Sequence, residues 1–319
     1  MNRWCVTGGN GLLGTKLIKA SPEHVEWLSL DIHELSFVPL KGEYVRADIT
    51  SKAETMSLIS RFRPEVVFHT AALTHVDECE TNRDRAWDVN VSGAENVAEA
   101  CRACGASMIH LSTDYVFDGR SGPYDEEAGT CPLNYYGTTK LESEVRVSAA
   151  CPDSIIARSM VLYGYEPHVR PNFAMWVIGS LLQGRTISVV TDQMGNPTLA
   201  DDLASGLIAL TGMKYHGVLH TAGGEWISRF DFAKRLAGVF TLDDSLIREI
   251  KTSELELPAS RPLLSGLKTD RMNQLGIHFQ KVDSALRLMK LQMEHFGAIR
   301  AYLEENPEKD QENNYENKA

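Results

Sequence analysis

The sequence predicts an α/β protein with a doubly wound parallel sheet, followed by a smaller, mostly helical C-terminal substrate lobe. Short apolar runs alternate with helix-like segments over the first half of the 319 residues, a rhythm typical of a parallel sheet with helices on both faces. A glycine-rich turn separates the first apolar run from the first helix-like segment. After Tyr163 the alternation stops, and prolines and glycines interrupt the sequence. These three observations indicate a nucleotide-binding core with an appended lobe.

The elements of the predicted core follow one another with clear stop signals. We expect strands at residues 4–7, 25–30, 44–45, 65–68, 107–111 and 155–157. Apolar residues at helical spacing predict helices at 12–20, 53–62, 85–104 and 136–150. Pro64, Gly105 and Pro152 come directly after three of these helices, where such residues stop a helix.

The second half predicts helices at 173–182 and 201–210, a short strand at 218–220, and a mostly helical segment from 230 to 302. We therefore expect a dinucleotide-binding domain of residues 1–163 plus about 198–222. Residues of about 164–197 plus 223–302 would form the substrate-binding lobe. Residues 303–319 are acidic and lack apolar periodicity, which predicts a disordered tail.

Composition excludes several classes of function. With 32 Lys and Arg against 43 Asp and Glu, the net charge is -11, which disfavours a nucleic-acid binder because such binding relies on basic side chains. No apolar run approaches the ~20 residues of a membrane span, and no secretory signal precedes the first strand. The six cysteines are scattered, which predicts reduced thiols in a cytoplasmic protein. Cys101 and Cys104 form a C-x-x-C, interpreted as helix packing rather than a zinc site.

The glycine-rich turn predicts a Rossmann-type dinucleotide site. Gly8, Gly11 and Gly14 follow a predicted strand and open a predicted helix, so the backbone can approach a pyrophosphate at the helix N-terminus. The residues of this turn expected to bind the cofactor are Gly8, Asn10, Gly11, Leu12 and Leu13. Asp31 ends the second strand, where a carboxylate accepts hydrogen bonds from the adenosine ribose and favours NAD over NADP. Asp48 and Ile49 would flank the adenine. The alternatives are a ligand-free turn and an Asp31 that faces water.

The predicted reaction chemistry lies at Tyr136 and Lys140, one helical turn apart on the same helix face. A nearby ammonium stabilises phenolate, so we expect Lys140 to lower the pKa of Tyr136 towards neutrality. Such a phenol can exchange a proton with a substrate oxygen while hydride moves at the adjacent carbon. Thr113 follows the fifth strand, and we expect its hydroxyl to hold that oxygen. The alternative is a structural role, in which the hydroxyl only caps the end of the strand.

These residues resemble an extended short-chain dehydrogenase/reductase, through the glycine motif, Asn90, Ser112-Thr113 and Tyr136-x-x-x-Lys140. Longer motifs resemble the dTDP-4-dehydrorhamnose reductase family: residues 112–119 (STDYVFDG), 132–140 (PLNYYGTTK), 192–198 (DQMGNPT) and Arg261-Pro262. The resemblance covers roughly residues 3 to 295. It implies an oxidoreductase that uses NADH or NADPH to reduce the 4-keto group of a nucleotide-activated 6-deoxyhexose, in deoxysugar biosynthesis.

The resemblance also implies roles at matching positions. Ala71, Ala72 and Leu73 would line the nicotinamide-ribose side, Lys140 would hold that ribose, and Asn90 would support the cofactor and active site. Tyr136, Lys140 and Thr113 would be the catalytic residues. The residues expected to meet the sugar nucleotide are Thr74, Val76, Asp114, Tyr115, Asn172, Phe173 and the segment from Gln193 through Pro197 to Thr198.

Two departures and two alternatives accompany the resemblance. Lys16 replaces a Glu that binds Mg²⁺ at a dimer interface in some members, so we expect no metal, while a homodimer is allowed. Met160 stands where a Trp often lies beside the sugar, which leaves the sugar open. The similar beta subunit of methionine adenosyltransferase offers a non-catalytic, regulatory alternative, and sugar-nucleotide epimerases offer a second one. A dehydratase is disfavoured because Asp114-Tyr115, not Asp-Glu, follows Thr113.

Overall fold

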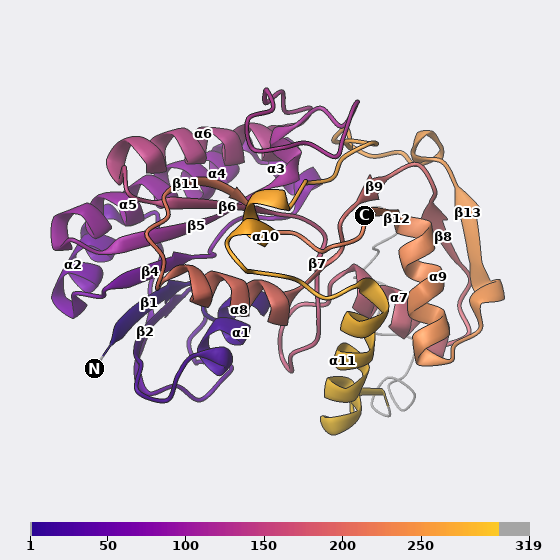
Figure 1. The fold of residues 1–319 in the computed structure, drawn as a ribbon, viewed down its shortest axis with the longest axis horizontal. Helices are drawn as coiled ribbons and strands as arrows, with labels where there is room; N and C mark the ends of the chain where they lie inside the picture. Colours follow the sequence, from indigo (N-terminus) through magenta and orange to yellow (C-terminus); the bar gives the residue numbers. More distant parts are fainter. Residues whose placement is uncertain (1, 300–319) are drawn as a thin grey trace.

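The computed structural model describes residues 2–299 and centres on a seven-stranded parallel sheet (Figure 1). The strand order is β11-β6-β5-β4-β1-β2-β3. Their bounds are β1 (Arg3–Thr7), β2 (Glu26–Asp31), β3 (Gly42–Arg46), β4 (Val66–His69), β5 (Ser107–Thr113), β6 (Ile155–Ser159) and β11 (Gly217–His220). The chain runs outward in both directions from β1, which pairs with β2 on one side and β4 on the other. This reversal of strand order is where doubly wound sheets bind ligands.

Helices cover both faces of the sheet, as the alternation of the sequence predicts. One face is covered by α2 (Lys52–Phe62), α5 (Gly93–Cys104) and α6 (Tyr135–Ala150), and the other by α1 (Leu12–Ala20) and α8 (Ala200–Leu210). The strands serve both layers because successive side chains point to opposite faces. In β1, for example, Trp4 and Val6 join the cluster under α1 and α8, whereas Cys5 joins the cluster under α5.

The predicted long helix at 85–104 is interrupted. After α3 (Val76–Thr81) and α4 (Arg83–Trp87), the chain forms a π-helical turn at Asp88–Ser92 before α5 continues. A π turn inserts an extra residue into the helix and often marks a functional site. Here it presents the buried Asn90 towards α6.

The second part of the chain has its own apolar core, to the right in Figure 1. It is built from α7 (Phe173–Leu182), α9 (Arg229–Phe240), α11 (Val282–His295) and the parallel pair β8 (Ile187–Val190) and β13 (Ile247–Ile250). Two short pairs join its segments: β7 (Leu162–Tyr163) with β10 (Thr198–Leu199), and β9 (Met194–Gly195) with β12 (Ile227–Ser228). The sequence did not predict the β8–β13 pair, because the apolar run in each strand is too short to indicate a strand.

Two buried ion-pair groups join the parts. Arg261 makes a bidentate pair with Asp77 of α3, at 3.0 and 2.7 Å, across 184 residues of sequence. Lys16 of α1 lies 3.1 Å from both Glu166 and Asp201. Helix α10 (Asp270–Gln274) also packs its Met272 against the sheet core, although it lies within the segment expected to form the lobe. The two parts are therefore closely interlocked.

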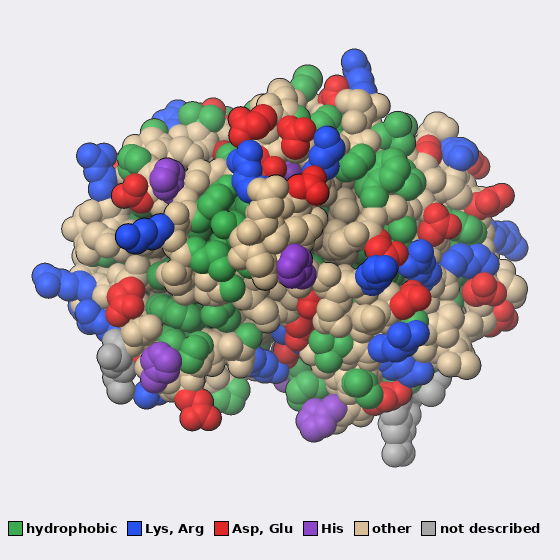
Figure 2. Space-filling model, in the orientation of Figure 1, with side chains coloured by type: hydrophobic (Ala, Val, Ile, Leu, Met, Phe, Trp, Pro, Cys, Tyr) green, Lys and Arg blue, Asp and Glu red, His purple; other side chains and the backbone are tan. Residues whose placement is uncertain are grey.

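The surface carries no large field of one sign on the face shown in Figure 2, where acidic and basic side chains are interspersed. Over residues 2–299, none of the helices is long and apolar enough to cross a membrane. The predicted disordered tail, 303–319, lies outside the described residues.

Helix α6 is fastened to β5 by a row of buried polar side chains, Thr139, Lys140, Ser143 and Glu144, which we term the polar seam. Glu144 accepts hydrogen bonds from the Ser112 hydroxyl at 2.5 Å and from Arg158 of β6 at 2.9 and 2.6 Å. Ser143 bonds the ring of His110 at 2.9 Å. Buried polar groups are tolerated when they are paired in this way.

Removing one member of the buried pair should be costly. Glu144→Ala leaves Arg158 charged and without its carboxylate, so we expect the free energy of unfolding to fall by about 3–5 kcal/mol. Glu142→Ala is the matched control, because Glu142 lies on the same helix and pairs with Arg146 at the surface; it should cost under ~1 kcal/mol. Urea unfolding of both variants measures the difference, and equal losses would contradict the prediction.

Candidate active site

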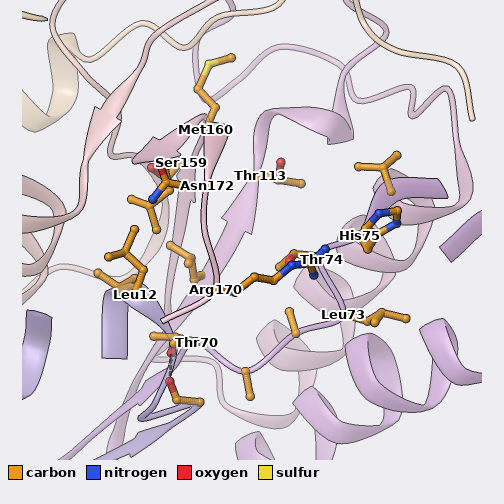
Figure 3. A pocket seen from close by; sticks show the side chains of 18 of the residues that line it. Leu12, Thr70, Leu73, Thr74, His75, Thr113, Ser159, Met160, Arg170 and Asn172 are labelled. Carbon is orange, nitrogen blue, oxygen red and sulfur yellow. Dashed lines mark hydrogen bonds between the residues drawn. The ribbon is translucent and has the colours of Figure 1, made fainter. Parts of the chain in front are cut away.

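A large cavity of about 1180 Å³ opens at the carboxyl ends of the central strands and is lined by both parts of the chain. Its volume exceeds the ~300–1,000 Å³ of ordinary small-molecule pockets, so it has room for two ligands. Figure 3 shows Leu12 and Thr70 on its sheet side and Asn172 and Met160 on the side of the second part. The cavity therefore joins the predicted cofactor and substrate residues.

The glycine turn forms a cradle that fits a dinucleotide. Gly8 has a φ of +75°, which favours glycine, and a Cβ on Gly14 would lie 2.3 Å from the Gly8 carbonyl oxygen. Helix α1 can therefore begin directly against the turn. Among the described residues, no side chain caps its first N–H groups, so they are available to an anion at the positive end of the helix dipole.

Asp31 lies at the end of β2 and lines the cavity with Asp48 and Ile49. One of its carboxylate oxygens accepts from the Asn10 backbone N–H at 2.9 Å, and the other lies 2.7 Å from Nδ1 of His33. Asn10 also donates its side-chain amide to the Leu35 carbonyl at 2.9 Å. The loop after β2 is thus tied to the glycine turn, with the carboxylate held between them.

Thr113 and Tyr136 meet at the cavity, as the sequence predicts. Their side chains lie close enough for Thr113 to lower the Tyr136 pKa, and the ring of Tyr115 lies 5.5 Å from that of Tyr136. The expected lowering of the Tyr136 pKa is wrong for this structure: burial raises its pKa well above the ordinary value, and Thr113 opposes this only in part. The phenol therefore stays protonated at neutral pH and is suited to give a proton.

Lys140 is buried, and its ammonium donates to the Leu111 carbonyl at 2.7 Å. Burial lowers its pKa to about 8, while Glu144 acts in the opposite direction. A lysine with this pKa is mostly charged at pH 7. Lys140 follows Tyr136 by one helical turn, but it is not among the groups that shift the Tyr136 pKa, and it lies outside the residues that line the cavity.

Asn90 is buried and lies outside the residues that line the cavity, so its expected contribution to cofactor binding stays a prediction. Its Oδ1 accepts from the Leu73 N–H at 2.8 Å, and its amide donates to the Leu73 carbonyl and to Thr139 of the polar seam, both at 3.1 Å. Asn90 thereby holds the 71–73 segment against α6. Ala71, Ala72 and Leu73 themselves line the cavity.

Comparison with known proteins identifies the relationship. A family model described as the RmlD substrate binding domain matches residues 2–294. The chain belongs to this family. A dTDP-4-dehydrorhamnose reductase from Streptomyces griseus is 37% identical over 285 residues, covering 86% of this chain and 88% of that protein. A dTDP-4-keto-6-deoxy-D-glucose reductase from Streptomyces niveus is 33% identical over 282 residues, covering 86% and 92%.

Solved structures of the RmlD family agree with the fold. The crystal structure of a dTDP-4-dehydrorhamnose reductase from Bacillus anthracis in complex with NADP has a TM-score of 0.83 at 30% identity, covering 92% of this chain and all of that one. A Clostridium acetobutylicum homologue has a TM-score of 0.81, also at 30% identity. The predicted fold class and the predicted family are both confirmed.

Most of the residues predicted to meet the sugar nucleotide line the cavity: Thr74, Val76, Asp114, Tyr115, Asn172, Phe173, Gln193, Met194, Gly195 and Pro197. Asn196 and Thr198 of the predicted segment are not among the lining residues. Some also have structural duties. Asn172 caps α7 by accepting from the Met175 N–H at 3.3 Å, and Gln193 donates to Thr252 at 3.1 Å. The buried Asp114 carboxylate accepts from Thr113 at 3.1 Å and from Ser265 at 2.5 Å. This RmlD-family site thus orders its own polar groups.

Several cavity residues escape sequence reasoning. His33, Phe37 and His168 form a row of rings beside Asp31, with centroids 5.1 and 6.0 Å apart. Arg229 begins α9, and Arg170 extends from the loop after β7 towards Thr74 (Figure 3). The RmlD-type motifs carry no signal for these residues, because each stands in sequence that is locally unremarkable.

Proposed function

We propose that the protein reduces the 4-keto group of a nucleotide-activated 6-deoxyhexose with NADH or NADPH. The observation that carries the proposal is the interacting Thr113–Tyr136 pair, placed between the glycine cradle and the substrate-side residues of one cavity. Residues 1–163 with about 198–222 hold the cofactor. Residues of about 164–197 with 223–302 hold the sugar nucleotide.

The chain's own residues supply the acid chemistry. The cradle, Asp31 and the 71–73 segment would hold the nicotinamide dinucleotide, whose reduced form supplies a hydride. Thr113, whose hydroxyl donates to Asp114 in this structure, would turn that donor to the substrate carbonyl oxygen and orient it. Tyr136, protonated at neutral pH, gives its proton to that oxygen as negative charge develops there. The Lys140 ammonium stabilises the phenolate that remains, and the polar seam keeps these groups in register.

The compartment and the assembly belong to the same proposal. All six cysteines are free, and four of them are buried, which is consistent with a reducing, cytoplasmic environment. The nucleotide sugar would be the ligand of the site. The proposed assembly is a homodimer, which analytical ultracentrifugation would test.

The decisive experiment is a panel of nucleotide-linked 4-keto sugars, following the loss of reduced-nicotinamide absorbance with the purified protein alone. Turnover of at least one member supports the reductase. A regulatory subunit would bind cofactor, turn over none of the panel and co-purify with a stoichiometric second protein. An epimerase would change the sugar without net consumption of reduced cofactor.

Tyr136→Phe tests the proton donor. The substitution keeps the ring and removes the hydroxyl, so kcat should fall about 10²–10⁴-fold, while the Kd for NADH barely changes. Stopped-flow rates of the chemical step, with NADH fluorescence titration as the binding control, measure both. Tyr135→Phe is the matched control, because Tyr135 is the neighbouring phenol on α6 and lies outside the residues that line the cavity. Near-normal turnover by Tyr136→Phe would show that another group gives the proton.

The pH dependence should follow Lys140. Because the pKa of Lys140 is lowered to about 8, its ammonium is present below that pH and is lost as the pH rises through it. We expect kcat to fall above about pH 8. Lys140→Arg keeps a charge that does not titrate in this range, so its residual activity should lack this alkaline limb. An identical limb in the variant would assign the titration to another group.

Cofactor choice should follow Asp31. A 2′-phosphate near this carboxylate costs about 1 kcal/mol per charge pair at ~4 Å in water, and losing the ribose hydrogen bonds adds roughly another 1 kcal/mol. We expect NADH to work at least as well as NADPH, and Asp31→Ala to shift the kcat/KM ratio towards NADPH by about tenfold. Asp31→Asn separates charge from hydrogen bonding. A wild-type preference for NADPH, unchanged in both variants, would contradict the role of Asp31.

A further inference from the structure

Three arginines that reach into the molecule differ in their partners. Arg158 makes a bidentate pair with Glu144, and Arg261 makes one with Asp77. The half-buried Arg229, in contrast, has no carboxylate or other acceptor within hydrogen-bond distance of its guanidinium among residues 2–299. Its side chain lines the cavity instead. A half-buried guanidinium with no protein acceptor keeps its hydrogen-bond donors for a ligand, and its charge favours an anionic one.

The surroundings hold Arg229 in a defined place. It is the first residue of α9, and its backbone N–H donates to the Gln193 carbonyl at 3.0 Å. Its guanidinium lies 5.0 Å from the centre of the Phe173 ring. Burial lowers its pKa, whereas Tyr115 and Asp114 act to raise it, so the guanidinium lies within electrostatic range of both side chains. Arginine stays charged even when its pKa is lowered in this way.

The nearest carboxylate is already committed to other groups. The two oxygens of Asp114 accept hydrogen bonds from Thr113 and Ser265. Arg229 therefore lines the same cavity as Asp114 and Tyr115, within electrostatic range of both, without a hydrogen bond to the Asp114 carboxylate. Five N–H donors in a planar fork match the oxygens of a phosphate better than those of a neutral group.

We propose that Arg229 binds the diphosphate of the nucleotide-activated sugar and so fixes the distance between the nucleotide and the keto group at Tyr136. The inference rests on the proposed function for the identity of the substrate. The cofactor's pyrophosphate has a separate cradle of backbone N–H groups at residues 8–12, on the sheet side of the cavity. Arg229 instead shares the other side with Gln193 and Phe173. The two diphosphates are thus held by different means, backbone dipoles for one and a guanidinium for the other.

A binding comparison with truncated ligands tests Arg229. Calorimetric titrations of the full-length protein with thymidine, dTMP, dTDP, UDP and GDP measure how much affinity each phosphate adds. In Arg229→Met, we expect the tightest-binding nucleoside diphosphate to lose about tenfold to a hundredfold in affinity. Nucleoside and NADH affinities should be unchanged. Arg229→Lys keeps the charge but lacks the planar guanidinium, so its loss of diphosphate affinity should be intermediate. It also serves as the control for a folding defect in the Met variant.

The matched control is Arg248→Met. Arg248 lies on β13, is exposed, and lies outside the residues that line the cavity, so the same loss of charge there should leave every affinity unchanged. In turnover assays, the KM of Arg229→Met should rise more than its kcat falls. Steeper salt dependence of diphosphate binding in the wild type than in Arg229→Met would support a direct charge contact.

Other outcomes overturn the proposal. Equal losses for nucleoside and nucleoside diphosphate would make Arg229 a structural residue. Unchanged diphosphate affinity in Arg229→Met, or a loss confined to Arg170→Met, would place the diphosphate elsewhere. No binding of any diphosphate by the wild type would exclude this substrate class altogether. Arg229-dependent binding without reduction of any 4-keto sugar would uphold the inference and reject the proposed reaction.

Discussion

The polar seam between α6 and β5 is the constraint on which the site depends. Thr139, Lys140, Ser143 and Glu144 share one buried face of α6, and each is satisfied by a group on β5, β6 or the π turn. An apolar face could slide by a turn and still bury its area, because hydrophobic burial is non-directional. Hydrogen bonds and a buried charge pair allow one register. That register places Tyr136 beside Thr113, which ends β5.

The seam also explains how the charge of Lys140 can be kept inside the protein. Its ammonium donates to the Leu111 carbonyl, and the Glu144 carboxylate favours the charged form. Burial nevertheless dominates, so the pKa is lowered rather than raised. The lysine and the tyrosine are affected in opposite senses by the same burial, since it favours the neutral form of both. Tyr136 is therefore neutral near pH 7, whereas Lys140 is still mostly charged there because its pKa is lowered only to about 8.

The sequence predicted those features that depend on residues close together in the chain. The glycine turn, the Tyr136–Lys140 spacing and the strand–helix alternation are local patterns, and the structure shows each as predicted. It could not reveal the direction of the Tyr136 pKa shift, because that depends on burial by distant segments. The role of Asn90 depends on a π turn and on contacts 17 and 49 residues away. The β8–β13 ladder pairs runs whose own sequences are too short to identify them.

The same distinction applies to the two anion sites. A backbone cradle requires glycines at fixed spacing, because Gly8 has a positive φ and a side chain at Gly14 would collide with the Gly8 carbonyl oxygen. The residues of such a site must be close together in the sequence, so a sequence motif can identify it. A side-chain site has no such requirement: Phe173, Gln193 and Arg229 come from three separate segments and meet only through the packing of α7, β9 and α9. What marks this side-chain site is Arg229, a cation that has no carboxylate partner among the residues that the structure describes.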